Sequence, residues 1–466
     1  MDRRPGKNVC VMGLGRSGKA AINLLLKRGA SVVAFDDSDT FLSKSEISSY
    51  EEHGVVFLYD SSNEFSLVNL GFDLVVVSPG IAFDHPLVKR LDARRVPIWS
   101  ELELGWRETK CPSVAVTGTN GKTTTVEWIN AMLSESGLRT VAAGNIGLPL
   151  SEVAKEPETQ GLDMVVLEVS SFQLDRVNKF KPDVAIMLNL AEDHLDRHQT
   201  MENYIRTKAR IFEMQEPDDN VVIQWESWQQ LKQSNIPIAG QITTFSTEES
   251  LADLYLDGNL IVGRLPDWPK EVLNLDDCML KGKHQAANLM AVLLSGRAMR
   301  IPLESMIETV SSLQAGPHRC EMVAELNGVR FYNDSKATNT HALCSALQVM
   351  PEGASGLKNI WLIAGGLDKE LDFMGAVQDL ERRVKGVFLI GQTAAEMRHD
   401  WEGFVACNLA DNLVEAVAEA GRNAVPGDVV LLSPACASFD MFDSYQHRGE
   451  IYRATVAQWI DMMDCD

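Results

Sequence analysis

Basic residues are scarce in this sequence relative to acidic ones. Its 43 lysines and arginines face 65 aspartates and glutamates, which gives a formal net charge of −22 over 466 residues. The electric field of such a negative charge repels nucleic-acid backbones and anionic membrane surfaces, so we expect neither as a partner. An anionic small molecule would have to be held by local cations and backbone N–H groups.

Long hydrophobic runs and paired cysteine motifs are also absent. No apolar run approaches the ~20 residues of a transmembrane helix, and the N-terminal stretch MDRRPGKNVCVMGLG lacks the apolar region and cleavage site of a signal peptide. The eight cysteines are scattered and form no C-x-x-C pair. These absences predict a cytoplasmic protein with reduced thiols and no membrane insertion.

The sequence does contain a recurring alternation of short β-branched runs and amphipathic helices, which predicts an α/β protein. Runs such as DMVVLEVSSF are almost continuously apolar, as in strands buried on both faces of a parallel sheet. The length predicts two or three domains, and we divide the chain into 1–108, 109–315 and 316–466. The polar stretch 213–280 is predicted to form peripheral strands and loops. Ligands of such folds bind at the carboxyl ends of strands.

The first glycine motif is GLGRSG, Gly13 to Gly18, between a predicted strand and a predicted helix. Asp36 follows about 20 residues later, as in a dinucleotide-binding fingerprint. Three glycines allow a backbone to approach a diphosphate, and an acidic residue can accept ribose hydroxyls. NAD and a UDP-sugar both meet these requirements, and a tight strand-to-helix turn without a ligand would use the same glycines.

The second glycine motif is VTGTNGKTTT, Val116 to Thr125. It resembles a phosphate-binding loop in which Gly118 and Gly121 are three positions apart, where the common P-loop has five. Lys122 can reach the β- and γ-phosphates of a nucleotide, and Thr123 or Thr124 can ligate Mg²⁺. The motif predicts phosphate binding.

Three residues further along could serve a metal bound at this loop. Glu168 and His194 follow predicted strands, although an exposed strand-end carboxylate and a solvated loop histidine are the plain alternatives. Lys208 shares a predicted helix face with Tyr204 and Phe212, and by itself it would be interpreted as an exposed helical lysine.

Over nearly its full length, this set of motifs resembles the Mur ligase family, ATP-dependent amide-forming enzymes that build the peptide of bacterial cell-wall precursors. Family members share the short TGTNGKT loop. The resemblance implies an α/β fold of three domains: an N-terminal Rossmann-like UDP-binding domain, a central P-loop-type ATP-binding domain with a mostly parallel sheet, and a C-terminal Rossmann-like domain that binds glutamate.

The resemblance also implies a nucleotide site with two Mg²⁺ ions. Thr123 and Glu168 would ligate one ion, His194 the second, and Lys208 would be the family's carbamylated lysine, an anionic metal ligand. Lys122, Glu168, His194 and Lys208 would be the catalytic set. Gln285 replaces the first Asn of the family's H-N-x-x-N motif, which leaves the role of that side chain open. ATP would be bound by Gly118, Thr119, Asn120, Gly121, Lys122, Thr123, Thr124, Asn288, Arg319 and Asp334.

The segment LLSPACASFDMFDSYQHRGE, Leu431 to Glu450, looks very like that of the family member that adds D-glutamate to UDP-N-acetylmuramoyl-L-alanine. Glutamate would be contacted by Lys336, Thr338, Lys369, Ser438 and Tyr445, the last of which is usually Phe in the family. The D-N-P-R motif of the diaminopimelate-adding relative does not occur. The UDP-substrate would contact Gly15, Arg16, Ser17, Asp36, Asp37, Ser78, Gly80 and Asn145.

This resemblance implies an ATP-dependent ligase that acts through an acyl phosphate and works as a monomer. The alternatives are another acyl-phosphate ligase that adds glutamate, such as a folyl-polyglutamate synthetase, and an L-glutamate-adding variant. An NAD-dependent oxidoreductase or a nucleotide-gated binding protein leaves more of the motifs without a role.

Overall fold

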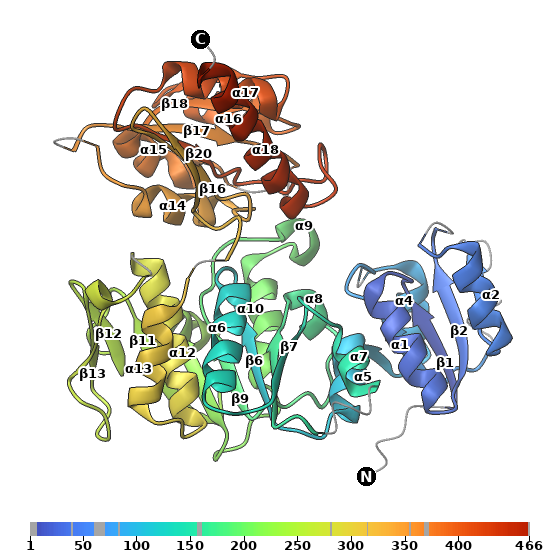
Figure 1. Ribbon diagram of the computed structural model, residues 1–466. Helices are drawn as coiled ribbons and strands as arrows, with labels where there is room; N and C mark the ends of the chain where they lie inside the picture. The colour runs from blue at the N-terminus through green and yellow to red at the C-terminus, as the bar shows by residue number, and fades with distance from the viewer. Residues whose placement is uncertain are drawn as a thin grey trace. The chain divides into compact units, whose positions relative to one another are not determined.

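The computed structural model describes residues 7–38, 41–59, 70–82, 84–155, 161–279, 282–314, 316–353, 356–367 and 372–464. This part of the chain is an α/β protein with three sheets (Figure 1). The predicted fold class is confirmed.

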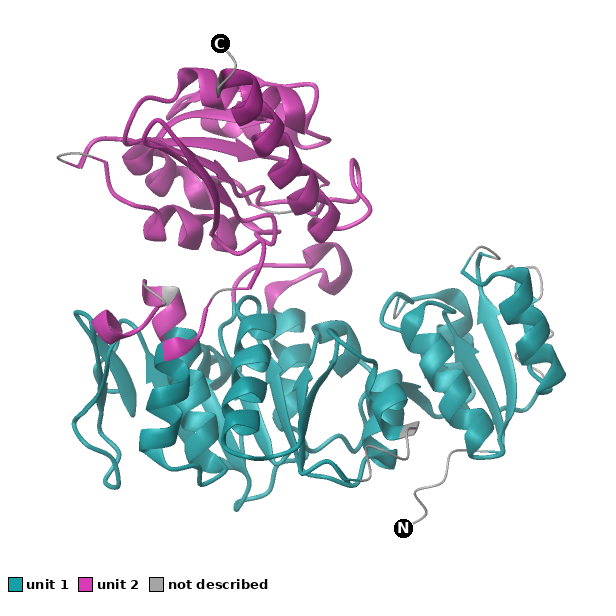
Figure 2. Cartoon of the chain, viewed as in Figure 1, with its two compact units in different colours: residues 1–190, 202–274, 287–311 teal, residues 191–201, 275–286, 312–466 magenta. Residues whose placement is uncertain are grey.

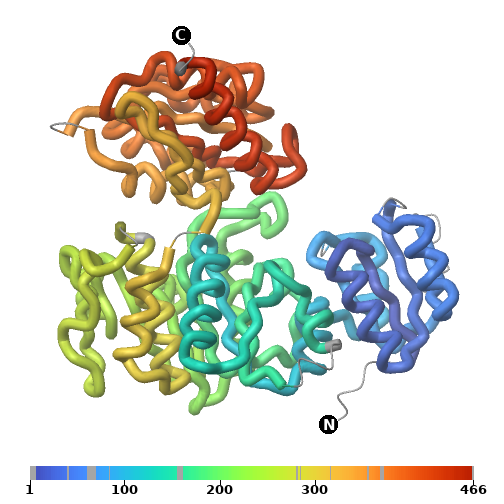
Figure 3. The backbone as a smooth tube through the Cα atoms, in the orientation of Figure 1, coloured from blue at the N-terminus to red at the C-terminus, as the bar shows by residue number. Residues whose placement is uncertain are grey.

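The chain forms two compact units (Figure 2). The first contains residues 1–190, 202–274 and 287–311, and the second contains 191–201, 275–286 and 312–466. The backbone therefore passes between the units several times along the sequence. Figure 3 follows the backbone from the N-terminus to the C-terminus. The first two sheets share one unit, so the domain boundaries placed after residues 108 and 315 stay predictions.

The first sheet has five parallel strands in the order β3-β2-β1-β4-β5. Its strands are β1 (Asn8–Met12), β2 (Ser31–Asp36), β3 (Val56–Tyr59), β4 (Leu74–Val77) and β5 (Ile98–Ser100). The helices around it are α1 (Arg16–Lys27), α2 (Lys44–Glu52) and α4 (Pro86–Ala93). Alternate side chains of β1 belong to different hydrophobic clusters. Val9 and Val11 pack with α1, and Cys10 and Met12 pack with α4. Both faces of the sheet are therefore covered.

The second sheet has nine strands in the order β14-β13-β12-β11-β10-β9-β6-β8-β7. Only the β12–β13 and β13–β14 pairs are antiparallel. The strands are β6 (Ser113–Thr117), β7 (Thr140–Gly144), β8 (Met164–Glu168), β9 (Val184–Met187), β10 (Asn220–Gln224), β11 (Gln241–Ser246), β12 (Leu254–Asp257), β13 (Leu260–Gly263) and β14 (Glu271–Asn274). The polar stretch after Glu213 does supply the strands on one side of this sheet.

Helices between residues 101 and 312 surround this sheet. They are α5 (Glu101–Glu108), α6 (Lys122–Glu135), α7 (Leu150–Lys155), α8 (Ser171–Leu174), α9 (Leu195–His198), α10 (Met201–Ala209), η3 (Arg210–Phe212), α11 (Trp225–Gln233), η4 (Leu275–Asp277), α12 (Lys283–Ala298) and α13 (Leu303–Ser312). Figure 1 shows α6, α12 and α13 side by side. They pack closely at Gly296, where a Cβ would meet the sulfur of Met306 at 2.2 Å and Met132 at 3.0 Å. None of the described helices has the length and apolarity needed to cross a membrane.

The third sheet, in the second unit, has the strand order β15-β16-β20-β17-β18-β19, and only β15 is antiparallel to its neighbour. Its strands are β15 (Glu321–Leu326), β16 (Val329–Asn333), β17 (Ile360–Ala364), β18 (Val384–Leu389), β19 (Ala406–Leu409) and β20 (Val429–Leu432). Its helices are α14 (Thr340–Val349), η6 (Met374–Ala376), α15 (Val377–Arg383), α16 (Ala394–Trp401), α17 (Leu413–Asn423) and α18 (Tyr445–Asp464). The core residues of α14 to α16 form one cluster with the strands, and those of α17 and α18 form another, which gives three layers.

Two buried acids on α5 connect the first sheet to the rest of the first unit. Glu101 Oε1 accepts the N–H of Ser151 at 2.6 Å, at the start of α7. The Glu103 carboxylate accepts the N–H groups of Asn178, Lys179 and Phe180 at 2.9 to 3.0 Å. Both side chains are almost completely buried. Since α5 directly follows β5, these bonds fix the end of the first sheet against the second.

We predict that Glu101→Gln makes the stability of the first unit less dependent on pH. Burial raises the pKa of Glu101 to about 7. The folded state therefore holds this proton more tightly than the unfolded chain, and stability is lost as the pH rises from about 4.5 to about 7. Glu101→Gln has no carboxyl proton to lose. Between pH 4.5 and pH 8, the free energy of unfolding of the variant should therefore rise by about 3 kcal/mol relative to that of the parent.

Melting temperatures of parent and variant between pH 4.5 and 8 test this expectation. Glu51→Gln, at an exposed position of α2, is the matched control for the loss of one carboxyl group. A pH-independent difference for Glu101→Gln would contradict the assignment.

Candidate nucleotide and metal site

The TGTNGKT loop lies at the carboxyl end of β6, between β9 and β8 in the second sheet, and leads directly into α6. Gly118 and Gly121 have φ values of 148° and 83°, in the region that favours glycine. A Cβ at Gly121 would also lie 2.4 Å from Oδ1 of Asn288 on α12. Glycine is therefore required at Gly121 by both conformation and space, and Asn288 lies directly against the loop. The expected contact of Asn288 with ATP stays a prediction.

Two residues that the motif analysis did not select hold this loop in shape. Asn189 accepts the N–H of Thr119 through its backbone oxygen at 3.0 Å and the N–H of Asn120 through Oδ1 at 2.8 Å, and its Nδ2 donates to the Asn120 carbonyl at 3.0 Å. The hydroxyl of Tyr204, on α10, lies 3.1 Å from Oγ1 of Thr119. Asn189 follows β9, which pairs with β6 through Thr117. Its place after a predicted strand was the sequence feature that could have marked it as a residue of this site.

Two lysines from different helices converge on this loop. Nζ of Lys122 donates to the carbonyl oxygens of Gly118 and Thr119, both at 2.8 Å. Nζ of Lys208, on α10, donates to the same Gly118 oxygen at 2.8 Å and lies 4.8 Å from the ring centroid of Tyr204. Lys208 is only 2% exposed, so its interpretation as an exposed helical lysine is wrong. The structure brings the lysine expected to bear a carbamate to the loop expected to bind phosphate.

Glu168 provides a buried carboxylate oxygen at the same edge of the sheet. It is the last residue of β8, beside Val116 of β6 and Gly144 of β7, and it is 2% exposed. Its Oε1 accepts a hydrogen bond from Nδ2 of Asn145 at 2.7 Å, whereas Oε2 has no hydrogen bond from any residue that the structure describes. An exposed strand-end carboxylate is therefore excluded.

A divalent cation fits this arrangement. A buried carboxylate oxygen without a partner is costly, and hard cations such as Mg²⁺ prefer oxygen ligands. Thr123 lies in the first turn of α6 and is also buried. Within the described ranges, no three His, Cys, Asp or Glu side chains form a cluster that could hold a metal alone.

His194 belongs to the second unit and precedes α9 in a left-handed conformation, with φ 55°. Its Nε2 lies 3.6 Å from Oδ2 of Asp193, and the same oxygen accepts a hydrogen bond from Nδ2 of Asn339 at 3.3 Å. The histidine thus has a carboxylate neighbour and a 30% exposed side chain. Its role as a metal ligand stays a prediction. Gln285, in the same unit, is buried.

Asp334 follows β16 at the carboxyl end of the third sheet. Its Oδ2 accepts a hydrogen bond from Oγ of Ser433 at 2.8 Å, and its Oδ1 accepts the N–H of Cys320 at 3.1 Å. Burial raises the pKa of Asp334 to about 7. Cys320 directly follows Arg319, so Asp334 holds the backbone next to the predicted phosphate-binding arginine. Contact between Asp334 and a ribose is not tested by these bonds.

Of the predicted glutamate residues, Lys336 lies against Tyr445, at the start of α18. Nζ of Lys336 lies 4.0 Å from the centroid of its ring, and Oγ of Ser335 donates to its carbonyl oxygen at 2.8 Å. Ser438 is buried and Thr338 is half-buried. Lys369 lies outside the described residues.

Arg448 is a buried residue that the motif analysis did not select. Its guanidinium donates to Oγ and the carbonyl oxygen of Ser335 and to the carbonyl oxygens of Cys436 and Ala437. Burial lowers the pKa of Arg448 to about 10. Arg448 therefore holds together the two loops that carry Lys336 and Ser438.

In the first sheet, the predicted UDP-substrate residues lie at the glycine turn. Gly15 is the N-cap of α1, and a Cβ at Gly18 would lie 1.8 Å from the Gly13 carbonyl oxygen. Asp36 accepts the N–H of Leu14 at 2.6 Å, and Oγ of Ser78 donates to the Gly13 carbonyl at 2.8 Å. Asp36 and Ser78 thus support the turn from within.

The other predicted substrate residues of this sheet are less enclosed. Asp37 lies 3.2 Å from Nε2 of His85, and Arg16 and Gly80 are exposed, whereas Ser17 is half-buried. Direct contacts of these residues with a UDP-substrate stay predictions.

We predict that Asn145→Ala weakens divalent-cation binding by about tenfold or more, as is usual when the residue that orients a metal ligand is lost. Asn145 contacts Glu168 through both its side chain and its backbone, because its N–H also donates to the Glu168 carbonyl at 2.9 Å. Electron paramagnetic resonance of Mn²⁺ with ADP present measures the affinity. Asn178→Ala, which removes an amide bonded to Arg107, is the control. Equal Mn²⁺ affinities of parent and Asn145→Ala would contradict the orienting role.

Three protein-family models match the chain. They are described as Mur ligase MurD-like, N-terminal domain, over residues 7–100; Mur ligase middle domain, over 116–296; and Mur ligase, glutamate ligase domain, over 318–436.

Two relatives named UDP-N-acetylmuramoylalanine–D-glutamate ligase are similar over most of their length. The one from Pelotomaculum thermopropionicum is 39% identical over 97% of both chains. The one from Acidobacterium capsulatum is 37% identical over 97% of this chain and 96% of its own.

Solved structures share the fold at low sequence identity. The UDP-N-acetylmuramate–alanine ligase from Thermotoga maritima aligns with a TM-score of 0.59 and 17% identity over 97% of this chain and 99% of its own. The MurF ligase of the same organism, in complex with ADP, aligns with a TM-score of 0.60 and 16% identity over 99% and 96%. Two lysines donate hydrogen bonds to the short TGTNGKT loop, and relatives above 30% identity match almost the whole sequence. The chain therefore belongs to the Mur ligase family.

Proposed function

We propose that this protein uses ATP to join D-glutamate to UDP-N-acetylmuramoyl-L-alanine, releasing ADP and phosphate, in peptidoglycan precursor synthesis. It would act as a cytoplasmic monomer. The observation that carries the proposal is the convergence of Lys122 and Lys208 on the Gly118 carbonyl. The chain is also 39% identical to a relative named UDP-N-acetylmuramoylalanine–D-glutamate ligase. The family comparison supports an ATP-dependent ligase, and the substrates follow from the names of the relatives.

The chemistry requires activation of a carboxylate, because a carboxylate does not condense with an amine in water. ATP phosphorylates the L-alanyl carboxylate: its oxygen attacks the γ-phosphorus, and the bond from that phosphorus to the β–γ bridging oxygen breaks. The amine of D-glutamate then attacks the acyl phosphate, loses a proton and displaces inorganic phosphate. Both steps bring anions together, so catalysis depends on positioned positive charge.

Lys122 and the loop N–H groups are suited to the phosphates. Lys122 follows Gly121 at the start of α6, where backbone N–H groups and the helix dipole favour anions. Its two bonds to loop carbonyls keep Nζ at the loop, and bound phosphate oxygens would replace those acceptors. Arg319 would add a second cation to the nucleotide.

Thr123 and Glu168 would hold one Mg²⁺, with His194 and a carbamylated Lys208 for a second. Bound there, Mg²⁺ would polarise the γ-phosphoryl group as a Lewis acid. Asn145 would keep Oε2 of Glu168 directed to the ion by holding Oε1. The two-ion arrangement and these individual ligands belong to the proposal.

Carbamylation of Lys208 fits its environment. CO₂ adds to a neutral amine, and the adduct is an anionic carbamate whose oxygens can bind a cation. Nζ of Lys208 is buried, and it shares the Gly118 carbonyl oxygen with the ammonium group of Lys122. Burial and a neighbouring positive charge both disfavour a second ammonium group at this position. The carbamate would convert a cation beside Lys122 into its counter-ion.

We predict that Lys208→Ala lowers turnover by about 100-fold or more and that small carboxylic acids, such as acetate, partly restore it by replacing the carbamate. Steady-state ADP release measures both effects. Lys270→Ala, which removes an exposed lysine of the β13–β14 hairpin, should keep full turnover with or without acetate. Unchanged turnover of Lys208→Ala, or a failure of every carboxylic acid to restore it, would remove the carbamate assignment.

The complete reaction tests the function itself. The protein is incubated with ATP, Mg²⁺, UDP-N-acetylmuramoyl-L-alanine and either D- or L-glutamate. We expect ADP release and a product whose mass increases by one glutamyl residue with the D-enantiomer only. Product with L-glutamate instead would assign the other enantiomer, and ATP binding without ADP release would favour a binding protein.

A further inference from the structure

Asn189 extends the strand next to the phosphate loop and binds the loop through its backbone. β6 and β9 are parallel neighbours in the second sheet. Their hydrogen bonding continues past the end of β6, where the N–H of Leu188 donates to the Thr117 carbonyl at 3.0 Å. The N–H of Thr119 then donates to the Asn189 carbonyl, also at 3.0 Å. A Cβ at Gly118 would lie 3.0 Å from Cβ of Leu188, so the first half of the loop runs directly against this segment.

The side chain of Asn189 makes a second connection, to a single residue of the loop. Its Oδ1 accepts the N–H of Asn120 at 2.8 Å, and its Nδ2 donates to the Asn120 carbonyl at 3.0 Å. A primary amide offers an acceptor and a donor together, and this pair of bonds requires both. A carboxylate at this position could make the first bond only, and an aliphatic side chain could make neither.

These bonds fix the orientation of two peptide groups in the loop. A trans peptide group is planar, so its N–H and its C=O point in opposite directions. The N–H of Thr119 belongs to the same peptide group as the Gly118 carbonyl, and the N–H of Asn120 to the same group as the Thr119 carbonyl. Because Asn189 accepts both N–H groups, it directs both carbonyl oxygens to the opposite side of the loop.

Both lysines of the candidate catalytic centre bind on that opposite side. Nζ of Lys122 donates to the Gly118 and Thr119 carbonyls, each at 2.8 Å. Nζ of Lys208 donates to the Gly118 carbonyl at the same distance, 2.8 Å. Each peptide group is therefore held at its N–H by Asn189 and at its oxygen by a lysine. Rotation of either group would move the acceptor to which these amino groups donate.

Asn189 also decides which N–H groups of the loop can serve a phosphate. Those of Thr119 and Asn120 donate to Asn189. Helix α6 begins at Lys122, and its N-cap is Gly121, which has no side chain with which to cap the helix. The first N–H groups of a helix have no partner within the helix and favour anions. The phosphate donors are therefore expected at the start of α6, beside the amino group of Lys122.

We propose that Asn189 is a positioning residue for the nucleotide site. It orients two loop carbonyls toward the amino groups of Lys122 and Lys208, and it acts through the loop rather than by contact with the substrates. The inference rests on the proposed function for the roles of the two lysines.

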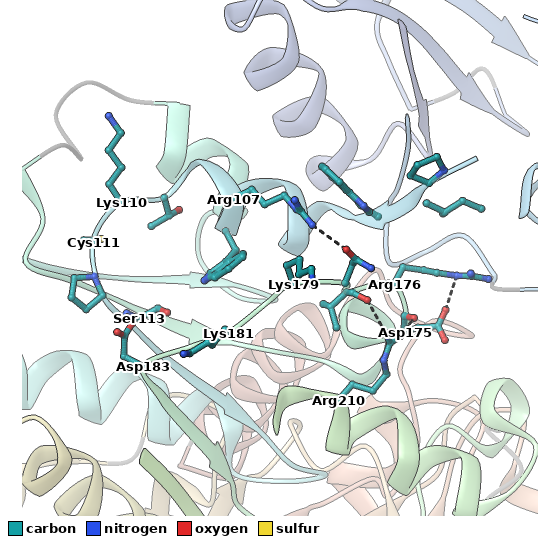
Figure 4. A pocket seen from close by; sticks show the side chains of 18 residues that line it. Arg107, Lys110, Cys111, Ser113, Asp175, Arg176, Lys179, Lys181, Asp183 and Arg210 are labelled. Carbon is teal, nitrogen blue, oxygen red and sulfur yellow. Dashed lines mark hydrogen bonds and ion pairs between the residues drawn. The ribbon is translucent and has the colours of Figure 1, made fainter. Parts of the chain in front are cut away.

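The other end of the same strand pair provides a matched control. The N–H of Ser113, at the start of β6, donates to Oδ2 of Asp183 at 2.8 Å, and the N–H of Asp183 donates to the Ser113 carbonyl at 2.9 Å. Figure 4 shows Ser113 and Asp183 together on the wall of a cavity of about 1060 Å³. Asp183→Ala therefore removes a side-chain bond between the same two strands at the end away from the phosphate loop.

Calorimetry with ADP and Mg²⁺ measures the effect on the nucleotide site of the full-length protein. We expect Asn189→Ala to bind ADP about tenfold more weakly than the parent, because two hydrogen bonds that hold the loop are lost. Asp183→Ala should bind ADP as the parent does. Equal affinities of Asn189→Ala and the parent, or an equal loss in the two variants, would overturn the proposal.

The reactivity of Lys122 distinguishes positioning of this lysine from a general loss of stability. In protein without nucleotide, acetylation followed by mass spectrometry measures how firmly its amino group is held. Labelling of Lys122 should be at least threefold faster in Asn189→Ala than in the parent and unchanged in Asp183→Ala. Lys270, an exposed lysine of the β13–β14 hairpin, should be labelled equally in all three proteins. Unchanged labelling of Lys122 in Asn189→Ala would contradict the positioning role.

Asn189→Asp tests the pair of side-chain bonds in a variant of nearly the same size. An ionised carboxylate keeps the bond to the Asn120 N–H but has no proton to donate to the Asn120 carbonyl. Protonation restores a donor, so the ADP affinity of Asn189→Asp should approach that of the parent as the pH falls from about 8 to about 5. Asn189→Ala cannot recover in this way, and its affinity relative to the parent should stay constant. A relative affinity of Asn189→Asp that does not change with pH would overturn the proposed pair of bonds.

These measurements separate the inference from the proposed function. A parent that binds ADP but forms no product with D-glutamate would contradict the proposed function, while a weaker ADP affinity of Asn189→Ala would still support the positioning role. A parent that forms the product, with Asn189→Ala equal to it in ADP affinity and in Lys122 labelling, would contradict the positioning role alone.

Discussion

The carbonyl oxygen of Gly118 is the acceptor on which the candidate catalytic centre depends. Lys122 and Lys208 reach it from α6 and α10, two helices between which β7, β8 and β9 lie in sequence. This shared acceptor is possible because Gly118 has a φ of 148°, and the loop is held by Asn189 and Tyr204. Gly121 lies directly against Asn288, and Asn120 exchanges hydrogen bonds with Asn189, so each end of the loop is enclosed.

Buried carboxylates have different roles at the two ends of the second sheet. At the carboxyl end, Glu168 has one oxygen held by Asn145 and the other without a hydrogen bond from the described residues, an arrangement suited to a cation. On the opposite side of the unit, all the contacts of Glu103 are with protein groups, three backbone N–H groups and Arg107. Glu168 is therefore a candidate ligand, and Glu103 is a structural connector.

Much of the fold could be predicted from the sequence because each strand of the parallel sheets is a short apolar run that ends in glycine or a polar residue. The run DMVVLEVSSF proved to contain β8, Met164 to Glu168. The glycine turns were also evident, since both sites require a backbone that only glycine adopts easily. Asn189, Tyr204 and Arg448 could not be selected in this way. Each acts through a contact with a residue distant in the chain, and the local patterns in which they lie do not show that contact.

The sequence by itself determined the α/β class, the position of the phosphate loop and the family resemblance, because these depend on residues close together in the chain. Only the tertiary structure decided whether a polar side chain is exposed or buried. Lys208 is the clearest case: helical periodicity made it resemble a surface lysine, and the fold placed its Nζ 2.8 Å from a buried loop carbonyl. Asn145 and Glu168 meet for the same reason, because adjacent parallel strands end side by side although more than twenty residues separate them in sequence.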